Sequence, residues 1–307
     1  MEKIDFSNFD LSLDRKIHFE HAKLQSLSFK DFGDKEVFIQ RDDLIHPVIS
    51  GNKWRKLEGW VKYARENGFH TLVTFGGAYS NHLVATAAAG YQLGFKTIGL
   101  LRADEHIENH YLSIAKSYGM KVIGVSRELY REKTQLFNEY SSFEGHLVIP
   151  EGGQGERAFE GFERLIASFD QTIDYIVHAS ATATTAVGLA LAIQKLNLKI
   201  RVKAILVLKN LQSQVDYARA FGVEDMIDFV DGFQFGGYAK VTPDLLRFND
   251  SFIEETQITV DPVYTAKALW ALREMIHCKG IEGKIVFLHT GGMLGRFSEK
   301  FQNLKKI

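Results

Sequence analysis

The sequence predicts an α/β protein whose sheets are mostly parallel and carry helices on both faces. Strand and helix patterns alternate along nearly the whole chain, and the expected strands are short apolar runs bounded by glycine turns. Continuous apolar runs are typical of strands that are covered on both faces, and the alternation is typical of parallel sheets. Ligands of such sheets bind beyond the carboxyl ends of the strands, so we expect the chemistry in the loops that follow them.

Hydrophobic spacing defines the expected elements. Trp54, Leu57 and Val61 recur at intervals of three and four in one helix, which Gly68 should end. Residues 1–35 are expected to form a surface segment, and we assign no element to residues 221–261. The expected strands are 37–40, 71–75, 97–101, 121–125, 146–149, 175–179, 202–208 and 284–289. The expected helices are 52–67, 81–93, 105–118, 127–140, 156–169, 183–196, 211–220, 262–279 and one after Gly292.

Composition excludes several classes of protein. The chain has 307 residues, 45% of them hydrophobic, with a formal net charge of -1, which is typical of a globular protein without a nucleic-acid-binding field. The one cysteine, Cys278, excludes an intramolecular disulfide and a multi-thiolate metal site. No apolar run approaches the roughly 20 residues that span a bilayer. The mixed, charged start does not resemble a signal peptide, so we expect a cytoplasmic protein without membrane partners.

Lys53 is unusual because of its position. It follows the loop ending in Ser50-Gly51 and lies at the start of a predicted helix. The positive end of the helix macrodipole disfavours a cation there, and a lysine with a lowered pKa can act as a nucleophile. An ordinary solvated lysine, followed by Arg55 and Lys56, is the alternative that this stretch leaves open.

Two loops after predicted strands could bind an anion. In Gly76–His82, either Ser80 or Asn81 can cap the following helix, and the glycines allow a close approach of the backbone. Ser180–Thr185 opens another helix with several hydroxyl groups, and helix-start amides attract phosphate. This second loop has neither the Gly-Lys-Thr ending of a P-loop nor the glycines of a dinucleotide fingerprint. Ordinary helix caps would also explain both loops.

Other stretches are less specific when taken singly. Thr290, in His289-Thr290-Gly291-Gly292, should point its hydroxyl group into the cleft at the end of the last strand. Asp261–Lys267 begins a predicted helix with Pro262 at a permitted early position, and Tyr264 would ordinarily be a buried aromatic residue.

Metal and hydrolase motifs are not found in the sequence. His106 and His110 lie one helical turn apart, but their spacing to the intervening acid does not match a zinc protease, and a solvated helix face explains them. The sequence also lacks the Gly-x-Ser-x-Gly turn of serine hydrolases. We therefore expect no metal site.

The motifs together resemble one family. Arg41-Asp42-Asp43, Gly51-Asn52-Lys53, Ser80-Asn81-His82, Asp261-Pro262-Val263-Tyr264 and the His289–Gly292 loop occur in the order found in D-cysteine desulfhydrases and 1-aminocyclopropane-1-carboxylate deaminases. These enzymes depend on pyridoxal 5'-phosphate and share the tryptophan-synthase-β-like fold, fold type II. The resemblance implies two open twisted mostly parallel sheets flanked by helices. It also implies a homodimer that acts on a small amino acid.

The resemblance assigns roles to individual residues. Lys53 would form the internal aldimine with the cofactor and act as the base at Cα, and Asn81 would bind the phenolic oxygen of the cofactor. Thr290 would meet its pyridine nitrogen, and Ser80 would face the substrate carboxylate with His82 nearby. Tyr264 and Tyr238 would be the active-site tyrosines. The phosphate would be held by Thr182, Ala183, Thr184 and Thr185.

Two positions favour one branch of the family. The deaminases resemble each other in carrying Glu where this chain has Thr265 and Leu where it has Thr290. The pair of threonines resembles the desulfhydrase branch, which converts D-cysteine to pyruvate, ammonia and sulfide. Deamination of 1-aminocyclopropane-1-carboxylate to 2-oxobutanoate and ammonia is the alternative.

The phosphate loop departs from the family pattern. It has Ala181 and Thr184 where glycines are usual, and a β-branched Thr184 tolerates positive φ poorly, so the loop should follow a different path. A non-catalytic binding protein on the same fold is therefore a second alternative. The expected domains are a small one at residues 54–155 and a large one that combines 1–53 with 156–307 and carries the phosphate loop.

Overall fold

The chain divides into two compact units. The computed structural model describes residues 17, 21–49, 51–169, 172–237 and 240–297, with side chains up to residue 295. The first unit is built around His46–Gly161, and the second combines His18–Ile45 with Phe162–Arg296. The expected domain division at residues 54 and 155 stays a prediction.

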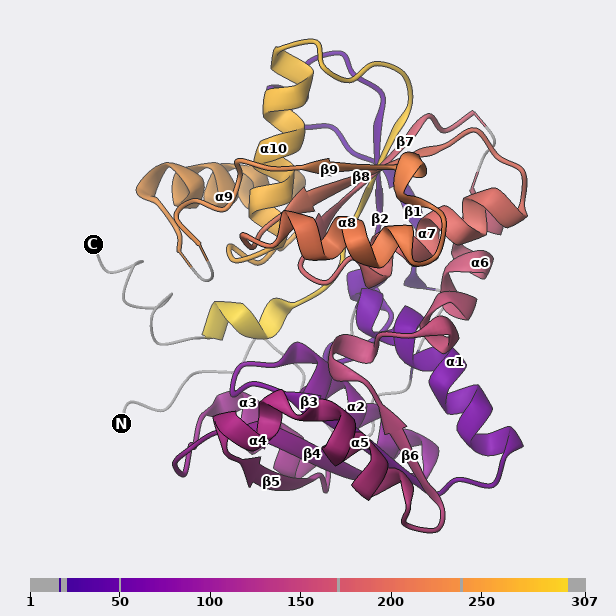
Figure 1. Ribbon diagram of the computed structural model, residues 1–307. Helices are drawn as coiled ribbons and strands as arrows, with labels where there is room; N and C mark the ends of the chain where they lie inside the picture. The colour runs from indigo at the N-terminus through magenta and orange to yellow at the C-terminus, as the bar shows by residue number, and fades with distance from the viewer. Residues whose placement is uncertain (1–16, 18–20, 50, 170–171, 238–239, 298–307) are drawn as a thin grey trace. The chain divides into compact units, whose positions relative to one another are not determined.

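The first unit contains a parallel sheet in the order β5-β4-β3-β6 (Figure 1). All three strand pairs run parallel, as the alternating pattern predicted. The strands are β3 (Thr71–Gly76), β4 (Lys96–Arg102), β5 (Lys121–Val125) and β6 (His146–Ile149). The helices are α1 (Asn52–Glu66), α2 (Asn81–Leu93), α3 (His110–Ser117), α4 (Arg127–Arg131) and α5 (Lys133–Ser141), followed by the 3₁₀ turns η4 (Glu151–Gly153) and η5 (Glu156–Phe159).

Both faces of this sheet are covered. Val73 and Phe75 of β3 pack on one face with Tyr130 of α4 and Leu136 of α5. Because side chains alternate along a strand, the residues between them face the other side, where α2 contacts β3 and β4. The carboxyl end of β3 therefore leads directly into the start of α2.

The second unit contains a sheet in the order β1-β2-β10-β7-β8-β9, parallel except for the antiparallel pair β1–β2 (Figure 1). The strands are β1 (Leu24–Ser26), β2 (Val37–Gln40), β7 (Tyr175–Ser180), β8 (Arg201–Leu206), β9 (Ile227–Val230) and β10 (Ile285–Leu288). The helices are α6 (Glu160–Ala167), which begins at the boundary of the units, α7 (Thr184–Lys195), α8 (Leu211–Arg219), α9 (Pro243–Thr256) and α10 (Thr265–His277). The 3₁₀ turns are η2 (Lys30–Phe32), η3 (Asp42–Leu44), η6 (Glu224–Met226) and η7 (Met293–Phe297).

The core of the second unit lies under α9 and α10. Val177 and Ala179 of β7 pack there with Phe252 of α9 and Leu272 of α10. Ile176 of β7 is also buried, and alternation turns it to the opposite face, where α7 contacts β8 and β9. Helices cover both faces of this sheet as well, so the predicted class is confirmed for both units.

Several expected helices are shorter than predicted. Residues 105–109 are not helical, because Asn109 caps α3 by accepting a hydrogen bond from the amide of Leu112. His106 and His110 therefore do not share a helix face. Residues 127–140 form two helices, because Glu132 has a non-helical backbone (ψ 50°). Residues 156–159 form a 3₁₀ turn, and the expected last helix is described only as the 3₁₀ turn η7, to Phe297.

The expected surface segment 1–35 is wrong for its described part. β1 pairs with β2, and Phe29 and Phe32 are 2% and 1% exposed and pack in the core beside α9 and α10. Residues 221–261, which received no predicted element, contain β9 and α9. No helix in the described part of the chain is long and apolar enough to cross a membrane.

Candidate active site

Lys53 is the second residue of α1. The helix starts after Gly51, which has φ 65° and ψ −143°, and its first turn contains no acidic residue and no side-chain cap. The Lys53 ammonium donates a hydrogen bond to Oδ1 of Asn52 at 2.6 Å. The amine therefore lies at the positive end of the helix with a neutral partner.

The segment that leads into Lys53 is held by His46. The ring of His46 is 1% exposed, and its Nδ1 accepts hydrogen bonds from the amides of Val48 and Ile49, both at 3.0 Å. Its Nε2 lies 2.6 Å from the side-chain amide of Gln92 in α2. His46 thereby connects the approach to α1 with α2.

A second lysine lies one turn further along α1. Lys56 is 4% exposed and donates to the carbonyl oxygen of Gly152 at 3.3 Å. Burial lowers the pKa of Lys56 well below its usual value, and the charge of Lys53 lowers it further. Trp60, on the next turn, donates to the carbonyl of Gly153 at 3.3 Å. α1 is thus bound to the turn that follows β6.

His82 is buried and neutral. The hydroxyl group of Thr74 donates to the carbonyl of Ile149 at 2.9 Å, so it accepts from Nε2 of His82 at 3.0 Å, and Nδ1 carries no proton. Burial, followed by the charges of Lys56 and Lys53, lowers the pKa of His82 to about 3. The ring is 3% exposed, so a direct contact with substrate stays a prediction.

Ser80 caps α2, as the sequence predicted. Its Oγ accepts a hydrogen bond from the amide of Leu83 at 3.2 Å. A Cβ atom at Gly76 would lie 2.7 Å from that Oγ and from the Leu83 side chain, so these two side chains leave no space for any residue but glycine. At Gly77 a Cβ would meet only Arg102, at 3.6 Å. The structure therefore requires only the first of the two glycines.

In the second unit, the threonine-rich loop does not place positive φ at Thr184. Positive φ falls on Ala183 (φ 54°, ψ −17°), directly before α7, and Thr184 is already helical. Oε1 of the buried Gln214 in α8 accepts from the Ala183 amide at 3.1 Å and from Ser180 Oγ at 2.5 Å. Asn210 also holds the loop by donating to the carbonyl of Ala181 at 2.8 Å. The loop can therefore keep this shape without glycine.

The threonines of this loop point their polar groups at the helix start. The Thr184 amide bonds to the carbonyl of Thr182 at 2.7 Å, and the two hydroxyl groups lie 3.3 Å apart. Thr184 is fully buried and Thr185 is 4% exposed. Amides at a helix start attract anions, so the start of α7 could hold one.

Asp261 organises the start of α10. The helix begins at Thr265, so Pro262 lies before it rather than in its first turn as expected. The fully buried carboxylate of Asp261 accepts hydrogen bonds from the amides of Val263, Tyr264 and Thr265 at 2.7–3.0 Å and from the Thr265 hydroxyl at 2.6 Å. Tyr264 is therefore fixed at the helix start, with a half-buried side chain.

The loop after β10 lies beside that helix start. Oγ1 of Thr265 is 3.5 Å from the carbonyl of Gly291, so the two threonine positions that distinguish the family branches lie in adjoining segments. Nδ1 of the buried His289 accepts from the Gly291 amide at 3.2 Å, so Nε2 donates to Thr259 at 2.9 Å. These contacts fix the backbone on either side of Thr290, which is 6% exposed.

The residues Arg41-Asp42-Asp43 support this loop from the neighbouring strand. Arg41 forms two hydrogen bonds with Asp43, at 2.8 and 2.9 Å, and Asp43 Oδ2 lies 4.0 Å from His289 Nε2. The fully buried Asp42 accepts from Gln40 at 2.9 Å. β2 and β10 are parallel neighbours, so their carboxyl ends lie at the same edge of the sheet.

The expected site residues are divided between the two units. Lys53, Ser80, Asn81 and His82 lie at the starts of α1 and α2, while the other described ones lie at the carboxyl edge of the second sheet. Tyr238 lies outside the described residues. Among described residues, no group of three or more His, Cys, Asp or Glu side chains could hold a metal ion. Cys278 follows α10, is exposed, and points its thiol at Met275.

Sequence reasoning missed the residues that hold these groups in place. Gln214 and Thr74 act on segments that are remote in sequence, so no local pattern identified them. Asp261 was part of a quoted motif but received no role of its own. Lys267, discussed below, was included in a quoted motif but received no role.

Comparisons with known proteins cover nearly the whole chain. Residues 21–291 match the family model described as "Pyridoxal-phosphate dependent enzyme". A relative from Thermotoga maritima, provisionally named 1-aminocyclopropane-1-carboxylate deaminase, is 31% identical over 86% of this chain and 90% of its own. The bifunctional D-cysteine desulfhydrase/1-aminocyclopropane-1-carboxylate deaminase of Arabidopsis thaliana is 29% identical over 86% of this chain and 74% of its own.

A solved structure supports the same assignment. The crystal structure of an "ACC deaminase homologue" superposes with a TM-score of 0.78 at 27% identity and covers 100% of both chains. The family match spans the starts of α1, α2, α7 and α10 and the loop after β10, which are the places where the expected site residues lie. The chain belongs to the family of pyridoxal-phosphate-dependent enzymes.

Proposed function

We propose that this enzyme cleaves D-cysteine by αβ-elimination. D-cysteine and one water molecule give pyruvate, ammonia and hydrogen sulfide, which balances all atoms. The observation that carries this choice is the buried hydroxyl group of Thr265, which donates to Asp261 at 2.6 Å beside the Thr290 loop.

The described residues fit pyridoxal phosphate. Ala183 and the threonines at the start of α7 offer backbone amides and hydroxyl groups for the phosphate. Lys53 offers an amine for covalent attachment, and Asn81 offers an amide for the phenolic oxygen. Thr290 offers a neutral partner for the pyridine nitrogen. When bound, the cofactor supplies an electron sink that weakens the bonds at Cα of an amino acid.

We assign the proton and substrate steps to residues of this chain. In the proposal, Lys53 removes the proton from Cα, and its amine lies at the start of α1, where the first turn contains no acidic residue. Ser80 keeps its own hydroxyl proton while its oxygen caps α2, so it can donate to the substrate carboxylate. Tyr264 and Tyr238 lie near the leaving group of the substrate in this proposal. His82, as a neutral ring, binds the start of α2 to Thr74.

The second candidate is deamination of 1-aminocyclopropane-1-carboxylate to 2-oxobutanoate and ammonia. It is favoured by the names of the Thermotoga maritima relative and of the superposed structure. The Arabidopsis thaliana relative is named for both activities, so the two substrates share one family of sites. The residues at positions 265 and 290 favour D-cysteine.

A side-by-side assay tests the choice of substrate. Purified protein loaded with pyridoxal phosphate is incubated with D-cysteine, L-cysteine or 1-aminocyclopropane-1-carboxylate, and pyruvate and 2-oxobutanoate are measured separately. We expect pyruvate and sulfide from D-cysteine as the main products. Faster release of 2-oxobutanoate would select the deaminase instead, and no keto acid above a Lys53→Ala control from any substrate would refute both.

Assembly, location and catalytic competence belong to the same proposal. A homodimer in the cytoplasm is implied by the family resemblance, and light scattering should give twice the chain mass of 34.8 kDa. The non-catalytic alternative predicts protein that stays colourless after incubation with pyridoxal phosphate. A visible absorption band that borohydride bleaches would exclude that alternative.

A further inference from the structure

A strained turn follows β9. Gln234–Gly237 is closed by a hydrogen bond from the Gly237 amide to the Gln234 carbonyl at 3.0 Å. Its two central residues, Phe235 and Gly236, have φ of 52° and 91°, and Gly237 has φ of 127°. Positive φ at both central positions suits Asn and Gly and is rare for a bulky aromatic residue. Other contacts must hold Phe235 in this conformation.

The main contact comes from Lys267. This lysine is fully buried, and its ammonium donates to the carbonyl of Gln234 at 2.8 Å and to that of Gly237 at 3.1 Å. The first and last carbonyls of the turn are thus joined by one cation. Lys267 is the third residue of α10, where the helix dipole disfavours a cation. The two carbonyl groups offset this unfavourable position.

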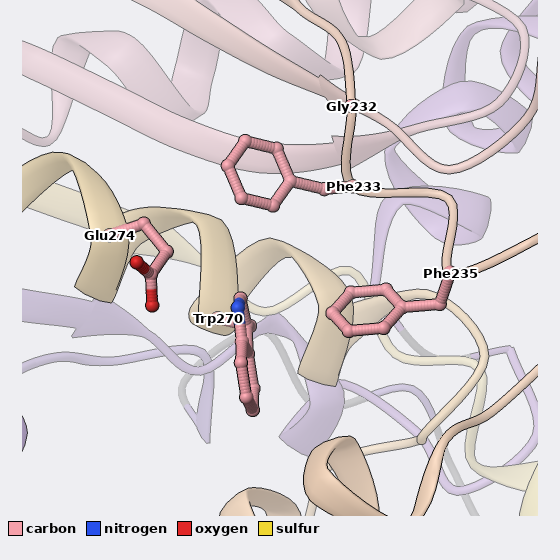
Figure 2. A pocket seen from close by; sticks show the side chains of 5 residues that line it. All are labelled: Gly232, Phe233, Phe235, Trp270 and Glu274. Atoms are coloured by element: carbon pink, nitrogen blue, oxygen red, sulfur yellow. The ribbon is translucent and has the colours of Figure 1, made fainter.

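The ring of Phe235 supports the same arrangement. It contacts Trp270, one turn after Lys267 on α10, with ring centres 5.5 Å apart and planes at 87°. Figure 2 shows both rings at the pocket of about 310 Å³ that they line with Gly232, Phe233 and Glu274. The guanidinium of Arg273 also lies 3.7 Å from the Trp270 ring centre. The turn is therefore fixed to α10 at two points.

We propose that Lys267 is a positioning residue of the catalytic site. The turn that it holds immediately precedes Tyr238 in the sequence, and α10, which carries Lys267, begins directly after Tyr264. One ammonium therefore ties together the two segments that lead to the proposed active-site tyrosines. This inference rests on the proposed function, because the two tyrosines receive their roles there.

Replacing Lys267 with methionine tests the inference. Methionine has a similar length and cannot donate, while both carbonyls keep a backbone donor, from Gly237 at 3.0 Å and Lys240 at 3.2 Å. We expect kcat to fall about 10- to 100-fold, as for a misplacement on the order of 1 Å, with little change in cofactor absorbance or melting midpoint. Lys267→Arg, which keeps donors, should recover much of kcat. If the methionine variant does not purify, Lys267→Gln replaces it.

Lys203→Met is the matched control. Lys203 is a largely buried lysine of the same unit that pairs with Asp228 in the sheet, at 3.0 Å, and takes no part in the proposed site. We expect this variant to keep wild-type kcat. An equal fall of kcat in both variants would indicate a general loss of packing and would contradict the inference.

Amide hydrogen exchange gives a readout that needs no substrate. In Lys267→Met the amides of Gly237 and Lys240 should exchange at least about tenfold faster, because the turn opens locally. Unchanged exchange together with unchanged kcat would overturn the role of Lys267. If the wild-type enzyme acted on neither substrate, the proposed function would fail, and the exchange rates would still decide whether Lys267 holds the turn.

Discussion

Helices α1 and α10 both carry a lysine in the first turn, and the surroundings of the two lysines differ. At the start of α1, the ammonium of Lys53 donates to the neutral side chain of Asn52, and the first turn contains no acidic residue. At the start of α10, Asp261 places a buried carboxylate on the helix amides, and Lys267 is bound by two carbonyl groups.

The difference separates the lysine proposed to be reactive from one that holds a turn. Around the start of α1, positive charge is disfavoured on two neighbouring side chains. Burial and the charge of Lys53 lower the pKa values of Lys56 and His82. Around α10, the carboxylate of Asp261 offsets the helix dipole, and the ammonium of Lys267 completes a turn. Position in a helix alone therefore does not distinguish the two lysines, whereas the known partners of their nitrogens differ.

Lys53→Ala should have the largest effect. The substitution removes both the point of covalent attachment and the proposed base, so we expect turnover of D-cysteine to fall by at least about 10⁴-fold, the upper range for loss of a general base. Pyruvate release measures it. Lys56→Ala serves as the neighbouring control, and a variant at Lys53 that retains wild-type turnover would break the comparison.

Asp261→Asn should destabilise the α10 start. The amide cannot replace the second carboxylate oxygen, which accepts both the amide and the hydroxyl of Thr265, so buried donors lose their partner. We expect a loss of about 3 kcal/mol in the free energy of unfolding, measured in urea. Asp244→Asn, an exposed acid in the first turn of α9, should cost less than about 1 kcal/mol. Equal losses would argue against a special role for Asp261.

His82 should make the stability depend on pH. In the folded protein the pKa of His82 is about 3, whereas its ordinary value is 6.5, so the unfolded chain takes up a proton first as the pH falls. The contribution of the neutral ring is therefore complete above pH 6.5 and is lost as the pH falls toward 3.

Urea unfolding at several pH values measures this contribution. We expect His82 to account for a slope of about 1.4 kcal/mol per pH unit between those limits, and His82→Gln should remove it. His106→Gln, at an exposed histidine, should leave the slope unchanged. If the slope survived in His82→Gln, the electrostatic account of the α1 start would lose its support.

Gly153→Ala should have the smallest effect. Gly153 has φ of 72°, and an added Cβ would lie 3.1 Å from Cε1 of His82. We expect a loss of about 1–2 kcal/mol, the usual penalty for a side chain in this conformation. Gly77→Ala, which meets no atom closer than 3.6 Å, should stay within about 0.5 kcal/mol. Thermal unfolding of the two variants measures both losses, and equal losses would show that the space between Gly153 and His82 is not important for stability.

Local signals in the sequence predicted the elements that carry the first unit. The expected helix 81–93 matches α2 in both bounds, because Ser80 caps it and Gly94 ends it. The expected helix 52–67 differs from α1 by one residue, although no side chain caps the start of α1, and Asn67 is the C-cap. By contrast, β9 depends on its pairing with β8, and no prediction covered it. No prediction covered α9 either, although Thr242 caps its start and Pro243 is its first residue.

The same distinction applies to the candidate site. Lys53 and Ser80 could be identified from their positions at helix starts, because capping and the macrodipole are local effects. Lys267 could not, because its partners at positions 234 and 237 are about 30 residues away. The sequence indicated that Thr184 would not take a positive φ, but it did not identify Ala183 as the residue that does, because Gln214, which holds Ala183, is 31 residues away.

One labelling experiment shows directly which of these lysines binds the cofactor covalently. Enzyme loaded with pyridoxal phosphate is reduced with borohydride, digested and sequenced by mass spectrometry to find the modified lysine. The account predicts one pyridoxyl-phosphate group per chain, on Lys53, with Lys56 and Lys267 unmodified. Modification of Lys56 or Lys267 in place of Lys53, or protein without any label, would contradict it.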